Sequence, residues 1–161
     1  MNWDEFIKFV GQVSGALVIF TISQALAKAI IDPLMEVRKV KGRIAHAVLH
    51  YTDHYRSPGI RDGESREAAR EALRYLGSEI VAAWAMVPFR KCLAILRFIP
   101  DVESVFMVRK NLIGLSNSLG PTEYVEQMRD DNHRRVIEIL GALGWKERTT
   151  DLAHDDPVGR G

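Results

Sequence analysis

The sequence predicts an all-α protein, with an N-terminal transmembrane helix followed by a small bundle of about four to five helices. Nineteen residues between Lys8 and Lys28 carry no charged side chain. Beyond them, apolar residues recur every three or four positions, and no segment alternates apolar and polar residues as a strand does. We therefore expect a membrane anchor over residues 1–31, a cytoplasmic helical bundle over 32–145 and a disordered tail over 146–161.

The composition disfavours several classes of function. Lys and Arg total 22 against 21 Asp and Glu in 161 residues, so no charge excess points to nucleic acid as a partner. The single cysteine, Cys92, excludes an intramolecular disulfide and a cysteine-based zinc site. The chain has neither a GxxxxGK[ST] nor a GxGxxG loop, and its acids and bases are spread as helix-surface pairs. We predict no catalytic residue and no cofactor, and an enzyme is the less favoured interpretation.

The uncharged stretch 9–27 has the length of a membrane-spanning helix. At about 1.5 Å per residue it extends about 28 Å, close to the roughly 30 Å hydrocarbon core of a bilayer. A signal peptide would begin with basic residues and have a shorter apolar core, whereas this chain begins MNWDEF. The stronger alternative is that residues 6–31 form the central helix of a soluble bundle, because Ser, Thr and Gln give the helix a polar stripe.

Membrane helices use such small and amide-bearing side chains to contact another helix, which favours the anchor. Gly11 and Gly15 also form a GxxxG step that permits close backbone approach. A homo-oligomer through the anchor helix is therefore a candidate assembly. The predicted helix–helix contact residues are Gly11, Ser14, Gly15, Thr21 and Gln24.

Basic residues are more frequent after the anchor than before it. The positive-inside tendency then places the N-terminus outside and the C-terminal domain in the cytoplasm of a single-pass protein of the cell membrane. Four basic residues are predicted to lie at the membrane surface, Arg38, Lys39, Lys41 and Arg43. Each would add about 1 kcal/mol of attraction to anionic lipid. A solvated helix face is the alternative.

Asp32-Pro33 predicts the start of a second helix, with Asp32 as N-cap and Pro33 in the first turn. Because a proline restricts the preceding residue to extended geometry, we also expect a break from the first helix. In the second helix His46, His50 and His54 follow at i, i+4 and i+8. Imidazoles one turn apart can bind a metal or titrate near neutral pH. The alternative is a histidine row without a ligand, since the glutamate of HExxH is missing and three ligands over two turns converge poorly.

Four further helices are expected. SPGIRDG, residues 57–63, is a turn that precedes a helix over 63–86. Pro88 and Pro100 bracket a short apolar helix, and Asp101 can cap the next one, whose apolar seam ends at Leu119. A last helix runs over 122–145, with Gly144 placed as a C′ glycine and Trp145 expected to fold back onto it.

Part of the chain also carries a resemblance. The residues are DPLMEVRKVKGRIAHAVLHYTDHY, a Pro-Gly turn, an Arg- and Glu-rich helix, and RKNLIGLSNSL, between Asp32 and Leu119. They resemble a group of uncharacterised small helical bacterial proteins that often have a membrane helix before the Asp-Pro step. The resemblance covers a bit over half of the chain. It implies membrane attachment and a helical cytoplasmic part, and it implies no activity.

Together these observations predict a non-enzymatic, membrane-anchored helical interaction or scaffold protein. Its expected partners are the lipid bilayer, a second copy of itself and a protein that the sequence does not identify, with no nucleic acid. The alternatives are a metal-binding or pH-sensing helical protein that uses His46, His50 and His54, and a soluble helical interaction module with residues 6–31 in its core.

Overall fold

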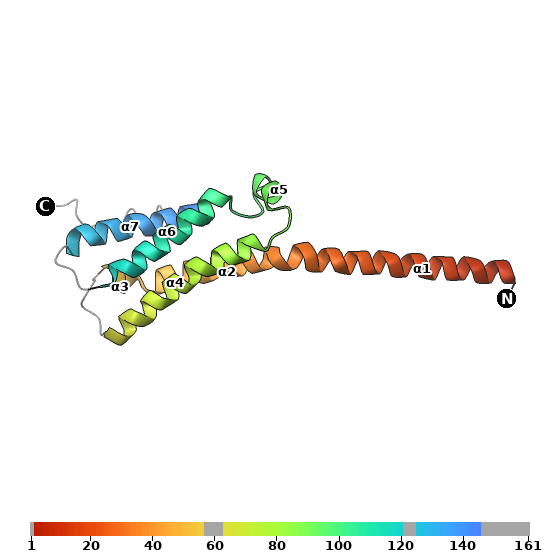
Figure 1. The fold of residues 1–161 in the computed structure, drawn as a ribbon, viewed down its shortest axis with the longest axis horizontal. Coiled ribbons are helices and arrows are strands. Elements are labelled where there is room, and N and C mark those ends of the chain that lie inside the picture. Colours follow the sequence, from red (N-terminus) through yellow and green to blue (C-terminus); the bar gives the residue numbers. More distant parts are fainter. Residues whose placement is uncertain (1, 57–62, 121–124, 146–161) are drawn as a thin grey trace.

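The computed structural model describes residues 2–56, 63–120 and 125–145, and every element in these ranges is helical. This confirms the predicted all-α fold. Figure 1 shows one long helix leaving the end of a bundle of shorter ones. The elements are α1 (Trp3–Leu26), the π-helical turn η1 (Ala27–Ile31), α2 (Asp32–His50), α3 (Thr52–Arg56), α4 (Gly63–Ala85), α5 (Arg90–Ile95), α6 (Val102–Ser118) and α7 (Val125–Ala142).

The helix does not break at Asp32-Pro33, so that prediction was wrong. Asp32 is helical, with φ −60° and ψ −48°, and its N–H donates to the carbonyl of Ala27 five residues back. Proline lacks an N–H, and its ring clashes with the carbonyl four residues before it in an α-helix. The wider π turn adds a residue at this point and shifts the carbonyls that Pro33 would meet. As a result, α1, η1 and α2 form one continuous helix from Trp3 to His50.

The bundle is built from α2, α4, α6 and α7. Helix α4 packs against α2 and α6, and α6 packs against α7. Consecutive helices run in opposite directions (Figure 1). The short α3 packs on α7, where the side-chain amide of the buried Asn132 donates to the carbonyl of Tyr55 at 3.1 Å. Leu34 is the first residue of the long helix that packs against the core, so the bundle begins close to the predicted boundary at Asp32.

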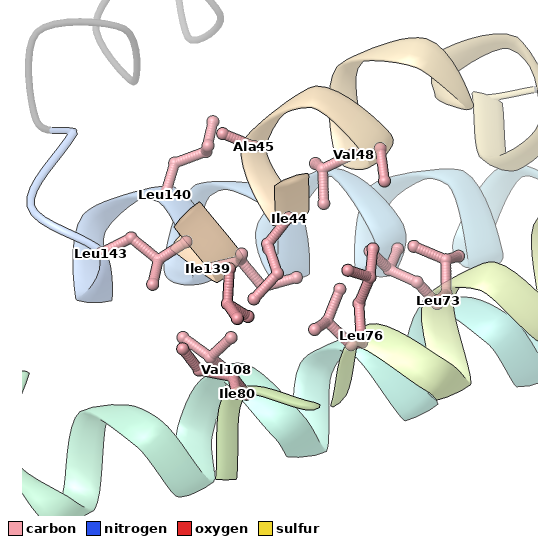
Figure 2. Close-up of a cluster of buried hydrophobic side chains, with 14 of the residues drawn as sticks. Ile44, Ala45, Val48, Leu73, Leu76, Ile80, Val108, Ile139, Leu140 and Leu143 are labelled. Carbon is pink, nitrogen blue, oxygen red and sulfur yellow. The ribbon is translucent and has the colours of Figure 1, made fainter. Parts of the chain in front are cut away.

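The apolar stripes predicted from spacing form the core. Figure 2 shows side chains such as Ile44, Leu73, Ile80 and Leu140 converging from separate helices. The whole predicted seam of α6 is buried: Val105, Val108, Leu112, Leu115 and Leu119. Gly77 lies at the contact of α4 with α6, where a Cβ would be in ordinary van der Waals contact with Leu112 and Arg109 at 3.7 Å.

Both caps that the sequence predicted around α6 and α7 are present. The Asp101 carboxylate accepts from the Ser104 N–H at 2.7 Å. Gly144 has φ +84°, and its N–H donates to the Gly141 carbonyl while the Trp145 N–H donates to the Leu140 carbonyl. That pair of bonds is the Schellman arrangement. The predicted tail 146–161 and the turn over 57–62 lie outside the described residues.

We expect Leu112→Ala to lower the free energy of unfolding by about 2–5 kcal/mol, because Leu112 is fully buried beside α4 and its loss leaves a cavity in the core. Leu96→Ala is the matched control, since the Leu96 side chain is exposed and the same atoms are removed. Urea unfolding in a mild detergent, followed by far-ultraviolet circular dichroism, measures both. Equal losses in the two variants would contradict the packing described above.

Candidate membrane interface

Helix α1 projects away from the bundle and buries none of its residues. Its exposed side chains include Phe9, Leu17, Ile19 and Phe20, each about 60 % or more accessible. A row of this kind along a whole helix is far larger than the apolar patches that soluble monomers expose. Residues 6–31 therefore do not form the core of the bundle, and that alternative was wrong. Within the described ranges, one helix is long and apolar enough to cross a membrane, and it contains α1.

The start of α1 is closed by its own side chains. Asn2 and Glu5 form a capping box in which each side chain accepts from the other residue's backbone N–H. The rings of Trp3 and Phe6 stack with their centroids 5.8 Å apart. Aromatic rings at the end of an apolar stretch are typical of the membrane–water interface.

The polar stripe of α1 is partly satisfied within the helix. The hydroxyls of Thr21 and Ser23 donate to the carbonyls of Leu17 and Ile19, each at 2.8 Å. Such bonds lower the cost of placing a hydroxyl in lipid. Of the predicted contact residues, Gly11, Ser14, Gly15 and Gln24 are exposed, and the two glycines have open space where a Cβ would be. Their contact with another helix stays a prediction.

The four predicted surface bases fall on two sides of α2. Lys39 pairs with Glu36 at 3.4 Å, and Arg43 pairs with Glu36 at 3.3 Å and with Glu79 of α4 at 2.6 Å. Lys41 is half-buried on the other side, in a hollow that Arg97 and Phe98 also line.

Burial lowers the pKa of Lys41 below its ordinary value of 10.5, and the positive charge of Arg38 lowers it further. The two effects agree in sign, because both disfavour the ammonium form. Arg38 and Lys41 therefore lie close enough to interact, on the side of α2 away from the ion pairs of Lys39 and Arg43.

The histidines do not form a single row. His46 and His50 stack with centroids 5.6 Å apart, but α2 ends at His50 and His54 belongs to α3. His54 Nε2 instead shares a hydrogen bond with Ser65 Oγ of α4 at 2.8 Å. In the described part of the chain, no three His, Cys, Asp or Glu side chains are grouped so that they could hold a metal ion. Tyr51 lies edge-on to both His50 and His54. The geometry therefore gives the metal hypothesis no support.

One further feature was missed from the sequence, the connection between α4 and α6. We call residues 86–98 the α5 segment. Most of its large apolar side chains point outward. Five of them are each more than half exposed: Met86, Phe89, Ile95, Leu96 and Phe98. The sequence did contain a signal, because two prolines bracket a stretch too short to bury so many apolar residues on one face. Figure 1 places α5 at the end of the bundle from which α1 leaves.

The ends of the α5 segment are fastened to the bundle. Val87, near its start, and Ile99, directly after it, are buried. The indole N–H of Trp84 donates to the Pro100 carbonyl at 3.0 Å, and the Arg90 guanidinium lies over the Trp84 ring at 4.9 Å. The segment therefore has a defined position although its apolar side chains are exposed.

No family model, curated protein or solved structure matches this chain.

We expect Asp101→Ala to lower the free energy of unfolding by about 1 kcal/mol at neutral pH, the usual effect of removing an N-cap. The hydrogen bonds from Ser104 hold the pKa of Asp101 below its ordinary value of 3.8. A depressed folded pKa means that the contribution is complete above the unfolded pKa and is lost as the pH falls through the folded pKa. The difference between the native chain and the variant, measured by urea unfolding, should shrink below about pH 4.

Asp101→Asn is the control for this prediction. Asparagine also caps helices but does not titrate, so this variant should keep most of the stability and lose the acid dependence. A difference between native chain and Asp101→Ala that is constant from neutral to strongly acid pH would contradict the assignment of the cap to the ionised carboxylate.

Proposed function

We propose that this protein is a non-enzymatic, single-pass membrane protein whose helical bundle serves as an interaction or scaffold module in the cytoplasm. The observation that carries the proposal is α1, a helix of 24 residues with no buried side chain. Exposing such a helix to water is unfavourable by about 25 cal/mol for each Å² of apolar surface, whereas a bilayer satisfies it without further protein.

The orientation rests on charge. Lys28 and the basic residues of α2 follow the uncharged stretch, whereas Lys8 is the one basic side chain before it. This asymmetry supports an outside N-terminus and a cytoplasmic bundle. Arg38 and Lys41 support a contact with anionic lipid, since among the described residues neither forms an ion pair and both lie in the N-terminal half of α2.

Self-association through α1 is the second part of the proposal. Gly11 and Gly15 lie one turn apart with open space at both Cβ positions, so a second helix can approach the backbone there. The hydroxyl of Ser14 and the amide of Gln24 are exposed, and interhelical hydrogen bonds of this type are worth about 0.6–2 kcal/mol in membranes. Because α1 continues into α2, pairing of the anchors would also bring two bundles close together.

Membrane fractionation tests the anchor. We expect the full chain to stay in the membrane pellet after an alkaline wash and to be released by detergent. A chain that begins at Asp32 should be soluble and folded, because the core begins at Leu34 and α1 contributes nothing to it. Recovery of the full chain in the soluble fraction without detergent would overturn the proposal. Cutting of the bundle by a protease added to intact cells would reverse the orientation alone.

Gly11→Ile combined with Gly15→Ile tests the self-association. The two branched side chains block close approach of a second helix, so we expect dimerisation in vesicles, measured by energy transfer between labelled chains, to fall at least about tenfold, or roughly 1.4 kcal/mol. Val10→Ile with Val18→Ile is the matched control, because it adds side-chain volume to α1 without altering the glycines. Unchanged association in the glycine variant would remove the dimer and leave the anchor.

A further inference from the structure

We propose that the α5 segment is a second membrane contact, which lies in the interface of the same bilayer that α1 crosses. This inference rests on the proposed anchoring and adds a site to it. The occupant is the surface of a bilayer that contains anionic lipid. The segment would insert its apolar side chains among the headgroups while its basic side chains remain at the level of the phosphates.

The first observation is the exposure of large apolar side chains on a segment with a defined position. Ile95 is 81 % exposed, Met86 76 % and Phe89 74 %. Val87 and Ile99, near the two ends of the segment, are buried and hold it to the bundle. Clustered apolar exposure of this kind indicates a surface that is covered by something else.

The second observation is the backbone at the two ends of α5. Phe89 and Arg97 have φ of 50° and 60°, and they are the residues other than glycine with positive φ in the described ranges. A left-handed conformation costs such residues about 1 kcal/mol or more. The bond from Trp84 to Pro100 and the contact of Arg90 with Trp84 compensate for part of that cost. The left-handed turns keep the Phe89 side chain exposed, where it contributes no buried apolar surface to the stability of the fold.

The third observation is charge. Residues 86–100 contain three basic side chains, Arg90, Lys91 and Arg97, and no acidic one. Arg97 lines the same hollow as Lys41, a residue independently predicted to lie at the membrane surface. Asp101 also lines this hollow, but its carboxylate is engaged by the first turn of α6. Apolar residues interspersed with basic ones are typical of segments that lie in an anionic membrane interface.

The fourth observation is position along the membrane normal. Arg43 of α2 contacts Glu79 of α4, and the two helices are antiparallel, so the end of α4 lies opposite the first turns of α2. Ala85, six residues beyond Glu79, is therefore level with about residue 37, roughly 15 Å along the helix axis from the end of the uncharged stretch at Ala27. The α5 segment follows Ala85, at the end of the bundle from which α1 leaves (Figure 1). Interfacial segments lie within about 5–10 Å of the headgroup–acyl boundary, and the common tilt of about 20° would bring an off-axis segment nearer. Since the helix is continuous through η1, this offset is built into the chain.

The single cysteine provides the test, because Cys92 is exposed and lies in α5. The full chain is labelled there with nitrobenzoxadiazole and reconstituted into vesicles of phosphatidylcholine and phosphatidylglycerol. Lipids that carry a nitroxide near the headgroup or deep in the acyl chain then quench the dye. We expect shallow quenching at Cys92 that is at least about twofold stronger than at a water-exposed position, since an interfacial residue lies within reach of the headgroup nitroxide.

Two reference positions in a Cys92→Ser background complete the measurement. Leu17→Cys reports the middle of α1 and should be quenched by the deep nitroxide. Glu67→Cys lies at the opposite end of the bundle and should be quenched by neither lipid. Replacing Phe89, Ile95 and Leu96 by serine should abolish quenching at Cys92 and leave Leu17→Cys unchanged. Tyr75→Ser, which removes an exposed aromatic from the middle of α4, is the matched control and should have no effect.

The outcomes separate this inference from the anchor. Quenching at Leu17→Cys without quenching at Cys92 would overturn the α5 contact and leave the anchor intact. Absence of quenching at both positions would overturn both. Quenching at Cys92 alone would support the α5 contact and remove the anchor. Protection of the Cys92 dye from lipid quenchers and from aqueous iodide alike would show that protein, such as a second copy of the chain, covers the segment, and would overturn the inference.

Discussion

The π-helical turn from Ala27 to Ile31 is the feature on which the placement of the other elements depends. It lets one helix pass through Pro33, where a regular α-helix would meet a clash and a missing hydrogen bond. Without it α1 and the bundle would be joined by a bend or a loop. With it the apolar α1 and the amphipathic α2 share one axis, so the packing on α2 also sets how the bundle stands relative to α1.

The two halves of that helix, α1 and α2, differ in how their apolar side chains are distributed around the helix. Around α1 nearly all positions are apolar or small, which a bilayer accommodates on every side. Helix α2 has a single buried stripe that includes Val37, Val40 and Ile44, and charged residues cover the rest. The change occurs within a few residues of η1, where the first contacts with the bundle begin.

The connection from α4 to α6 carries apolar side chains that do not take part in the core of the bundle. Helices α4 and α6 pack against each other directly, and a long connection between them is not needed to form the core. Yet the α5 segment lies between these helices. Two of its residues are in the left-handed conformation, and most of its aromatic and aliphatic side chains are exposed. Together with α1, a lipid contact there would give the bundle two points of attachment and so restrict its rotation about the anchor.

Local pattern was sufficient for much of the fold. Apolar spacing identified the buried stripes of α2, α4 and α6, the length of the uncharged stretch identified α1, and the residue types at Asp101 and Gly144 identified the caps. These features depend on neighbours within a few positions along one helix, which is why the sequence by itself determined them. The contact residues that the sequence predicted on α1 are exposed in the structure, and their contact with another helix stays a prediction.

Only the tertiary structure decided three other points. The rule for residues before proline predicted a break at Asp32, but a π turn relieves the same clash and keeps the helix continuous. The spacing of His46, His50 and His54 assumed one helix, whereas the chain ends α2 at His50 and directs His54 to Ser65. The sequence predicted a short apolar helix between Pro88 and Pro100 but not which of its side chains are covered, and most of the large ones are exposed. Spacing along the chain reports which side chains are apolar, and the position of neighbouring helices decides which of them are covered.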